Sequence, residues 1–441
     1  AENRKPPLHM MWRRFFVAFA TTGCGIKSFN CVSLYKTIKE TMKRRFLLVA
    51  MAAVLGAFAA VSQERTYTVI VSLDGFRWDY AEAYNTPTFD AMAAQGVKAR
   101  MMPSYPSKTF PNHYTLATGL VPDHHGIVAN SFYAGERYFS LGDSATRSDG
   151  SFYLGEPIWN TVRKAGKRSA TIYWVSSDVA VQGQHPDVWV DYLKKPLLTY
   201  DQRVKMALDL LQKPENERPD LLMMYFEEPD VVGHNMFPLS KQTKKVVESL
   251  DSLMGVLWAG IKALPIADKV NFIVTSDHGM ETVSPDRIVP VVKHLKKEWV
   301  RRIDGNLPAQ IYVSKPEYVD SVLFALKDVD HARVCRRQDV PKYLNYGTSD
   351  RVGDVLVMPD LGWLAQDNDV FAPGGAHGFD HTAQAMHVMF RAVGPAFKTG
   401  YVKQGVFQNT NIYSLLARLL GIEQWAAPTD GDIKNVEDML K

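Results

Sequence analysis

Residues 67–75 read Tyr-Thr-Val-Ile-Val-Ser-Leu-Asp-Gly, a run of β-branched and apolar residues that ends in an aspartate and a glycine. The first seven have the length and composition of a strand buried on both faces. Similar apolar runs follow at 170–175, 221–226, 270–276 and 385–393. Because these runs are nearly continuous in apolar character, we expect them to form the centre of a mostly parallel sheet.

Amphipathic stretches separate the apolar runs, at residues 86–95, 158–165, 200–211 and 241–264. Their apolar residues recur at the spacing of a helix with one buried face. Strands that alternate with helices predict an α/β sandwich of three layers, with helices on both faces of the sheet. In folds of this kind, ligands bind at the carboxyl ends of the strands.

Residues 285–372 interrupt this alternation. They are rich in charged residues and proline, and they have short strand and helix signals of their own. The signals lie at residues 289–297, 310–313, 316–326 and 354–358. We therefore expect one catalytic domain over residues 64–430, with residues 285–372 inserted into it as a small cap.

Residues 1–60 form a leader that differs from the rest of the chain. They hold ten of the 51 basic and two of the 47 acidic residues, so the formal charge of +4 becomes −4 without them. Residues 42–60 have the pattern of a signal peptide, with three basic residues, an apolar stretch and Ala-Phe-Ala-Ala at the end. The apolar stretch is shorter than the ~20 residues of a spanning helix. Residues 1–41 show no pattern that joins them to the fold, which leaves Met42 as an alternative start.

The leader predicts an exported protein, periplasmic or secreted, with no stable membrane span after cleavage. An uncleaved membrane anchor is the alternative. The acidic balance of the remaining chain gives no sign of a nucleic-acid-binding surface. Cys335 is the one cysteine after the leader, so no disulfide framework is expected. Nothing in the sequence implies a protein partner.

Several aspartates and histidines stand at or near the ends of the predicted strands. They are Asp74, Asp230, His234, Asp277, His278 and His377. A lone aspartate after a strand is usually a turn or helix-capping residue. Three carboxylates and three imidazoles at one edge of a sheet would be an unfavourable cluster without bound cations, and zinc takes mixed carboxylate and imidazole ligands.

The sequence Ser-Lys-Thr-Phe-Pro at residues 107–111 precedes a helical pattern. Pro111 fits the first turn of a helix, so Thr109 should lie at or just before the helix N-terminus. Backbone N–H groups and the helix dipole favour a phosphate there. Thr109 as a simple N-cap is the alternative. A hydroxyl becomes a strong nucleophile when a metal ion coordinates it, and the expected metal site therefore favours a catalytic Thr109.

Together these segments resemble the nucleotide pyrophosphatase/phosphodiesterase family of the alkaline phosphatase superfamily. The matching segments run in the family's order across residues 67–430. They are residues 72–77, 106–114, 116–120, 125–131, 227–234, 276–280 and 376–380. The resemblance implies an alkaline-phosphatase-like sandwich and a reaction through a covalent threonine intermediate.

The resemblance also assigns the metal ligands to two zinc ions. One zinc ion would be held by Asp230, His234 and His377. The other would be held by Asp74, Asp277 and His278, with the oxygen of Thr109 as its fourth ligand.

For the substrate, the resemblance implies that Asn130 and the Thr109 N–H bind a phosphate oxygen. Phe110, Tyr192 and Tyr225 match positions that grip the base or another leaving-side group, although packing in the core or rim would also explain them. The chain departs from the family at residues 174–178, which read Trp-Val-Ser-Ser-Asp where many members have Trp-Pro-Gly-Ser-Asp.

The implied activity is hydrolysis of phosphodiester or pyrophosphate bonds in a small-molecule substrate, such as a nucleoside triphosphate cleaved to the monophosphate and pyrophosphate. Phospholipid-type phosphodiesterases acting on glycerophosphocholine or lysophospholipids use the same two-zinc apparatus and are the main alternative, followed by phosphomonoesterases. A binding protein without turnover would lack a ligand or the nucleophile, and all seven positions are present.

Overall fold

The computed structural model of the chain describes Glu40, residues 65–366 and residues 373–441. Apart from Glu40, the predicted leader and its signal peptide at 42–60 lie outside the described residues, and so do residues 367–372 of the predicted cap. Export of the protein therefore stays a prediction. Among the described residues, no helix has the length and apolar character needed to cross a bilayer.

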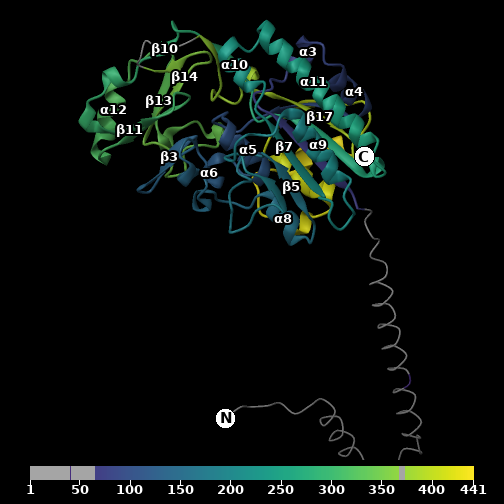
Figure 1. Cartoon of the computed structure of the whole chain (residues 1–441). Helices are drawn as coiled ribbons and strands as arrows, with labels where there is room; N and C mark the ends of the chain where they lie inside the picture. The colour runs from purple at the N-terminus through teal and green to yellow at the C-terminus, as the bar shows by residue number, and fades with distance from the viewer. Residues whose placement is uncertain (1–39, 41–64, 367–372) are drawn as a thin grey trace, which may run out of the picture. The chain divides into compact units, whose positions relative to one another are not determined.

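An eight-stranded sheet lies at the centre of residues 65–441 (Figure 1). Its strand order is β18-β2-β17-β8-β1-β7-β5-β6. Of these eight strands, β17 alone runs antiparallel to its neighbours. The strands are β1 (Tyr67–Leu73), β2 (Val97–Met102), β5 (Ser169–Ile172), β6 (Val188–Val190), β7 (Leu221–Phe226), β8 (Val270–Thr275), β17 (Val388–Val393) and β18 (Tyr401–Gln408). The predicted mostly parallel α/β sheet is confirmed.

Each of the five predicted apolar runs contains a strand of this sheet, and three further strands were not predicted. Strand β2 alternates buried and half-buried residues, and β18, at one edge of the sheet, has a single buried residue. Strand β6 has three half-buried residues at the other edge. Edge strands are covered less completely, so they lack the continuous apolar run by which buried strands are recognised.

Helices cover both faces of the sheet (Figure 1). In β1, Val69 and Val71 face one hydrophobic core and Ile70 faces another. Helices α4 (Pro87–Gln95), α9 (Tyr200–Leu211) and α11 (Lys241–Lys262) pack into the first core, and α5 (Thr109–Thr118), α8 (Ile158–Lys164) and α13 (Asn411–Leu420) pack into the second. All seven residues of β1 are buried as a result.

A second, four-stranded sheet of order β11-β12-β14-β13 lies within the predicted cap (green in Figure 1). Its elements are β11 (Val300–Asp304), β12 (Ala309–Val313), α12 (Val319–Ala325), β13 (Ala332–Arg336) and β14 (Val355–Pro359). Ile311, Val322 and Val357 belong to a hydrophobic cluster confined to this part of the chain. Residues 289–365 therefore contain a core of their own, while the boundaries of the cap stay a prediction.

Helix α4 begins against Asp251 of α11. The buried Asp251 carboxylate accepts hydrogen bonds from the N–H groups of Thr88 at 3.1 Å and Phe89 at 2.9 Å. The N-cap residue Thr86 makes no side-chain capping bond. Asp251 thus satisfies two helix-start amides that would otherwise lack a partner.

Asp251→Ala is expected to lower the free energy of unfolding by ~1–3 kcal/mol, because two N–H groups at the start of α4 lose their acceptor. Denaturant titration measures the change. Ser252→Ala is the matched control, since it removes a hydroxyl that bonds to the Glu248 carbonyl within the exposed face of α11. Equal destabilisation by the two variants would contradict the assignment.

Candidate active site

The predicted metal ligands meet at the carboxyl end of the central sheet. Strands β8, β1 and β7 are neighbours, and Ser72 of β1 pairs with Thr275 of β8 and Tyr225 of β7. Their carboxyl ends therefore lie side by side, each followed by ligand residues. Helix α10 (Asp230–Met236) carries the ligands that come after β7.

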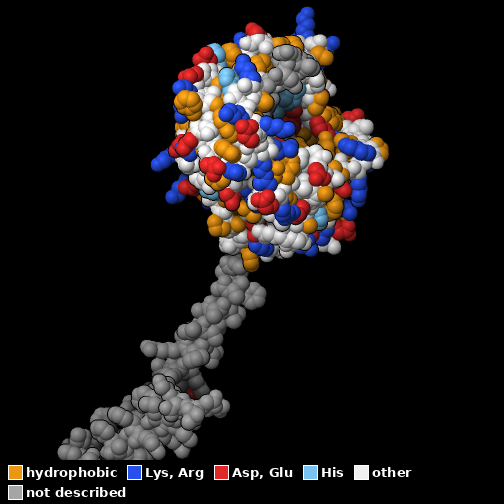
Figure 2. Space-filling view, turned by 90° about the vertical axis from the view of Figure 1, so that its left-hand side faces the viewer, with side chains coloured by type: hydrophobic (Ala, Val, Ile, Leu, Met, Phe, Trp, Pro, Cys, Tyr) orange, Lys and Arg blue, Asp and Glu red, His pale blue; other side chains and the backbone are white. Residues whose placement is uncertain are grey.

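His377 reaches the same place by a separate route. It follows β16 (Gly374–Ala376), which pairs with β9 (Glu281–Val283), the strand just after His278. In the face shown in Figure 2, histidine side chains are visible within a hollow, with acidic side chains near it.

One ligand group consists of Asp74, Asp277 and His278, which are all buried. The Nε2 atom of His278 lies 3.0 Å from Asp277 Oδ2 and 3.4 Å from Asp74 Oδ1. The Oγ1 atom of Thr109 lies 3.0 Å from the same Nε2. The candidate nucleophile and these three ligands therefore share one site.

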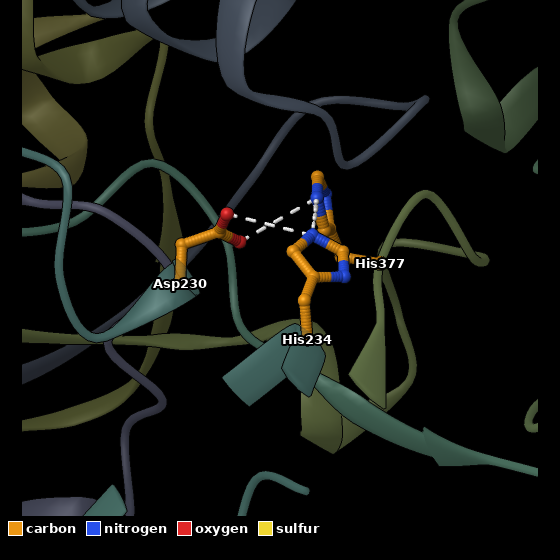
Figure 3. Close-up of side chains that lie close together, drawn as sticks. All are labelled: Asp230, His234 and His377. Carbon is orange, nitrogen blue, oxygen red and sulfur yellow. Dashed lines mark hydrogen bonds and ion pairs between the residues drawn. The ribbon is translucent and has the colours of Figure 1, made fainter. Parts of the chain in front are cut away.

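The other ligand group consists of Asp230, His234 and His377, whose side chains point toward one another (Figure 3). His234 Nε2 lies 3.4 Å from Asp230 Oδ2, and His377 Nε2 lies 3.5 Å from Asp230 Oδ1. The rings of His377 and His278 stack with centroids 3.6 Å apart, so the two groups are adjacent.

The three ligand histidines all place Nδ1 next to a backbone carbonyl. The acceptors for His234, His278 and His377 are the carbonyls of Gly375, Gly279 and Ser107, at 2.7, 2.9 and 2.9 Å. A carbonyl can only accept, so Nδ1 carries the proton in the neutral ring and Nε2 has a free lone pair. The Nε2 atoms of His234 and His377 are 3.1 Å apart. Two lone pairs at that distance repel each other, and a cation bound to both removes the repulsion.

The ligand carboxylates also lack enough hydrogen-bond donors to satisfy their oxygens. Asp74, Asp230 and Asp277 each have a buried oxygen with no hydrogen-bond donor among the described residues. Burial and repulsion from Asp277 and Asp230 raise the pKa of Asp74. Burial would raise the pKa of Asp277 too, but attraction to His278 and His113 outweighs it and lowers that pKa. The two groups therefore fit divalent cations, which would supply the missing charge.

Thr109 is the first residue of α5, and Lys108 is the N-cap residue. The alternative in which Thr109 merely caps the helix is wrong, because its hydroxyl lies against His278 and no side chain caps α5. Pro111 occupies the first turn, as predicted. The first N–H groups of a helix have no partner within it, so they are available beside the Thr109 oxygen.

The predicted substrate-contacting aromatic residues lie around a residue that the sequence did not indicate. The guanidinium carbon of Arg147 lies 5.6 Å from the Phe110 ring centre and 5.5 Å from the Tyr192 ring centre. Tyr225 contacts Tyr192 with ring centres 6.4 Å apart, and its hydroxyl donates to Asp74 Oδ2 at 2.6 Å. Tyr225 therefore orients a predicted metal ligand, a contact that the motif comparison did not predict.

Arg147 forms an ion pair with Asp178, the last residue of the segment that departs from the family's pattern. Arg147 Nη2 lies 2.7 Å from Asp178 Oδ2, and both side chains are more than nine-tenths buried. Arg147 Nε and Asp178 Oδ1 have no hydrogen-bond partner among the described residues. No sequence signal links the two, because α7 (Ser144–Arg147) reaches Asp178 only in the folded chain.

Asn130 lies directly before β3 (Ser131–Ala134), with its side-chain oxygen buried and unpartnered. The described part of the chain contains no hydrogen bond between Asn130 and Thr109. The role of Asn130 toward phosphate therefore stays a prediction.

The family described as type I phosphodiesterase / nucleotide pyrophosphatase matches residues 68–380. This chain belongs to that family. Ectonucleotide pyrophosphatase/phosphodiesterase family member 3 of Rattus norvegicus is 34% identical over 388 residues, 85% of this chain and 44% of the relative. Venom phosphodiesterase 2 of Crotalus adamanteus is 33% identical over 395 residues, 86% of this chain and 48% of the relative. The chain thus spans about half the length of these curated relatives.

Solved structures of the family share the fold. An inactive variant of murine ectonucleotide pyrophosphatase/phosphodiesterase 5 in complex with AMP has a TM-score of 0.80 and 33% identity, over 86% of this chain and all of that one. The human protein has a TM-score of 0.80 and 32% identity, over 85% of this chain and all of that one. The predicted family and fold class are confirmed.

Tyr225→Phe is expected to weaken zinc binding by about 10-fold or more, because Asp74 loses the hydroxyl that orients it. Titration of the metal-free protein with zinc, in competition with a chromophoric chelator, measures this affinity. Tyr192→Phe is the control, since Tyr192 makes no contact with a predicted ligand among the interactions of the described residues. Parental zinc affinity in Tyr225→Phe would show that the hydrogen bond to Asp74 does not support the ligand.

Proposed function

We propose that this chain is an exported two-zinc nucleotide pyrophosphatase/phosphodiesterase that reacts through a covalent intermediate on Thr109. The observation that carries the proposal is the 3.0 Å distance between Thr109 Oγ1 and His278 Nε2, within a group of three metal ligands. Membership in the family supports a phosphodiester or pyrophosphate substrate. Export, to the periplasm or the medium, rests on the pattern of residues 42–60.

The two ligand groups would hold the zinc ions separately. Asp74, Asp277 and His278 would hold one ion, and Asp230, His234 and His377 would hold the other. When bound, such ions lower the pKa of a coordinated hydroxyl or water and neutralise negative charge on the phosphate. A backbone carbonyl at each Nδ1 fixes the orientation of the ring, so that the three Nε2 atoms would be free to bind the ions.

Thr109 supplies the nucleophilic oxygen. A bond forms between Oγ1 and phosphorus while the bond from phosphorus to the leaving oxygen breaks, and the threonine then carries a phosphodiester. Water hydrolyses this ester, which releases the phosphate monoester and restores the hydroxyl. A nucleoside triphosphate would yield the nucleoside monophosphate and pyrophosphate.

Backbone and side-chain dipoles next to Thr109 bind the phosphate oxygens in this proposal. The free N–H groups at the start of α5 point toward the reacting end of the helix, where the helix dipole favours an anion. The amide of Asn130 supplies a further donor. Donors held in place before the reaction stabilise developing charge without reorganisation.

The aromatic residues favour a nucleotide over a phospholipid head group. Phe110 and Tyr192 both contact the guanidinium of Arg147, and the half-buried Tyr192 ring offers a base a partner for stacking. The murine relative that binds AMP supports this choice. A choline group can bind aromatic rings through its cation, but the guanidinium beside Phe110 and Tyr192 would repel that charge.

Thr109→Ala is expected to lower kcat by at least about 10³-fold, because the attacking oxygen is lost. Its zinc content should stay near two ions per chain, since the six Asp and His ligands remain. Thr109→Ser keeps a hydroxyl and should retain measurable turnover. Removal of zinc by a chelator should abolish the activity of the parent, and added zinc should restore it. Parental activity in Thr109→Ala would contradict the covalent mechanism.

A substrate panel tests the class of ester. The expected order of kcat/KM places p-nitrophenyl-TMP and ATP above bis-p-nitrophenyl phosphate, because the last lacks a nucleoside. p-Nitrophenyl phosphate and p-nitrophenylphosphorylcholine should follow. A preference for p-nitrophenyl phosphate would identify a monoesterase, and a preference for the phosphorylcholine ester would identify a phospholipid-type enzyme. Either preference would overturn the nucleotide assignment.

A further inference from the structure

Ser107 joins the nucleophile segment to the loop that carries His377. It lies two residues before Thr109 and is completely buried. Its hydroxyl donates to the Phe379 carbonyl at 2.9 Å and accepts from the Gly378 N–H at 3.1 Å. Its own carbonyl accepts from His377 Nδ1 at 2.9 Å. One residue therefore makes three hydrogen bonds to the loop 377–379.

Lys108 adds a fourth hydrogen bond, from Nζ to the His377 carbonyl at 3.3 Å. The loop also packs tightly at Gly378, whose φ is +113°. A Cβ atom there would lie 2.4 Å from the Leu307 carbonyl oxygen and 2.9 Å from Lys108 Cε. Only glycine fits this conformation and space, and its N–H then points at the Ser107 hydroxyl.

The two segments belong to different ligand groups. Thr109 lies against His278 in the group with Asp74 and Asp277, whereas His377 belongs to the group with Asp230 and His234. A shift of residues 107–109 would move the Thr109 oxygen, and a shift of loop 377–379 would turn the His377 ring. The hydrogen bonds of Ser107 connect these two movements.

We propose that Ser107 is a positioning residue that holds the Thr109 oxygen and the His377 ring in fixed relative positions, so that a single link aligns both metal groups. The inference rests on the proposed function, since the alignment matters when both groups bind zinc. It deepens that function by naming the residue that couples the two sites.

A plainer explanation is that the Ser107 hydroxyl simply satisfies buried backbone groups, as most buried polar atoms do. That role would stabilise the fold without favouring one metal ion. A positioning role predicts a selective loss at the His377 site, because Nδ1 of His377 depends on the Ser107 segment for its acceptor. The affinities of the two zinc ions, measured separately, distinguish the roles.

The test is a zinc titration of metal-free full-length parent, Ser107→Ala, Ser107→Thr and Ser104→Ala, in competition with a chromophoric chelator. The parent should bind two zinc ions. Ser107→Ala should bind one with parental affinity and the second about 10- to 100-fold more weakly. Ser107→Thr restores the hydroxyl and should recover much of the second affinity. With both sites filled, Ser107→Ala should show a lower kcat and a nearly unchanged KM.

Ser104→Ala is the matched control. The Ser104 hydroxyl is buried and donates to Asn409 Oδ1 at 2.8 Å, and in the described structure this hydroxyl bonds to no predicted ligand and not to loop 377–379. The Ser104→Ala variant should have a lower melting temperature than the parent and the same affinity for both zinc ions.

Parental affinity for both zinc ions in Ser107→Ala, with only a lower melting temperature, would overturn the inference. If the alanine variant does not fold, Ser107→Val has the shape of Ser107→Thr without the hydroxyl, and it should bind the second zinc ion more weakly than Ser107→Thr does; equal affinities of these two variants would overturn the inference. Failure of the parent to bind two zinc ions and to hydrolyse phosphodiesters would overturn the proposed function, and this inference with it. The parent measurements therefore separate the two failures.

Discussion

The cluster of three carboxylates and three imidazoles at one edge of the central sheet is the main electrostatic feature of this structure. The Nε2 atoms of His234 and His377 are 3.1 Å apart, and one oxygen of each ligand aspartate lacks a donor among the described residues. Such a cluster is unfavourable in a protein without cations, because burial and like charge oppose ionisation. The surrounding fold holds this cluster together. Divalent ions would relieve the repulsion between its side chains, and this relief would strengthen the binding of the ions.

Rigid parts of the molecule hold the site. Asp74 follows β1, and Asp277 and His278 follow β8, two strands at the centre of the sheet where hydrophobic cores cover both faces. Backbone carbonyls fix the histidine rings, and Tyr225 fixes Asp74. Ligands supported in this way lose little conformational freedom when ions bind, which is why sites on strand ends and helix starts are precise.

Part of the predicted substrate side of the site comes from less regular segments of the chain. Arg147 comes from the short helix α7, and Asp178 and Tyr192 come from loops beside β5 and β6. Loops tolerate sequence change more readily than strands without loss of the fold, so we expect the choice of substrate to depend on these segments more than the metal ligands do. The departure from the family's pattern at residues 174–178 falls in one of these loops, after β5, and includes Asp178 of the ion pair with Arg147.

The α/β class, the family and the six Asp and His side chains that meet near Thr109 were all predictable from the sequence, because buried strands show as apolar runs and these residues follow them in short motifs. Edge strands β6 and β18 escaped detection, since half-exposed strands have mixed composition. The folded structure was needed to show that Lys108 and not Thr109 is the N-cap residue of α5, that the Tyr225 hydroxyl donates to Asp74, and that Ser107 bonds to loop 377–379. These contacts join residues up to 272 positions apart, as Ser107 and Phe379 are. The spacing of residues along the sequence does not reveal such pairs, because they form only when the folded sheet brings its strand ends together.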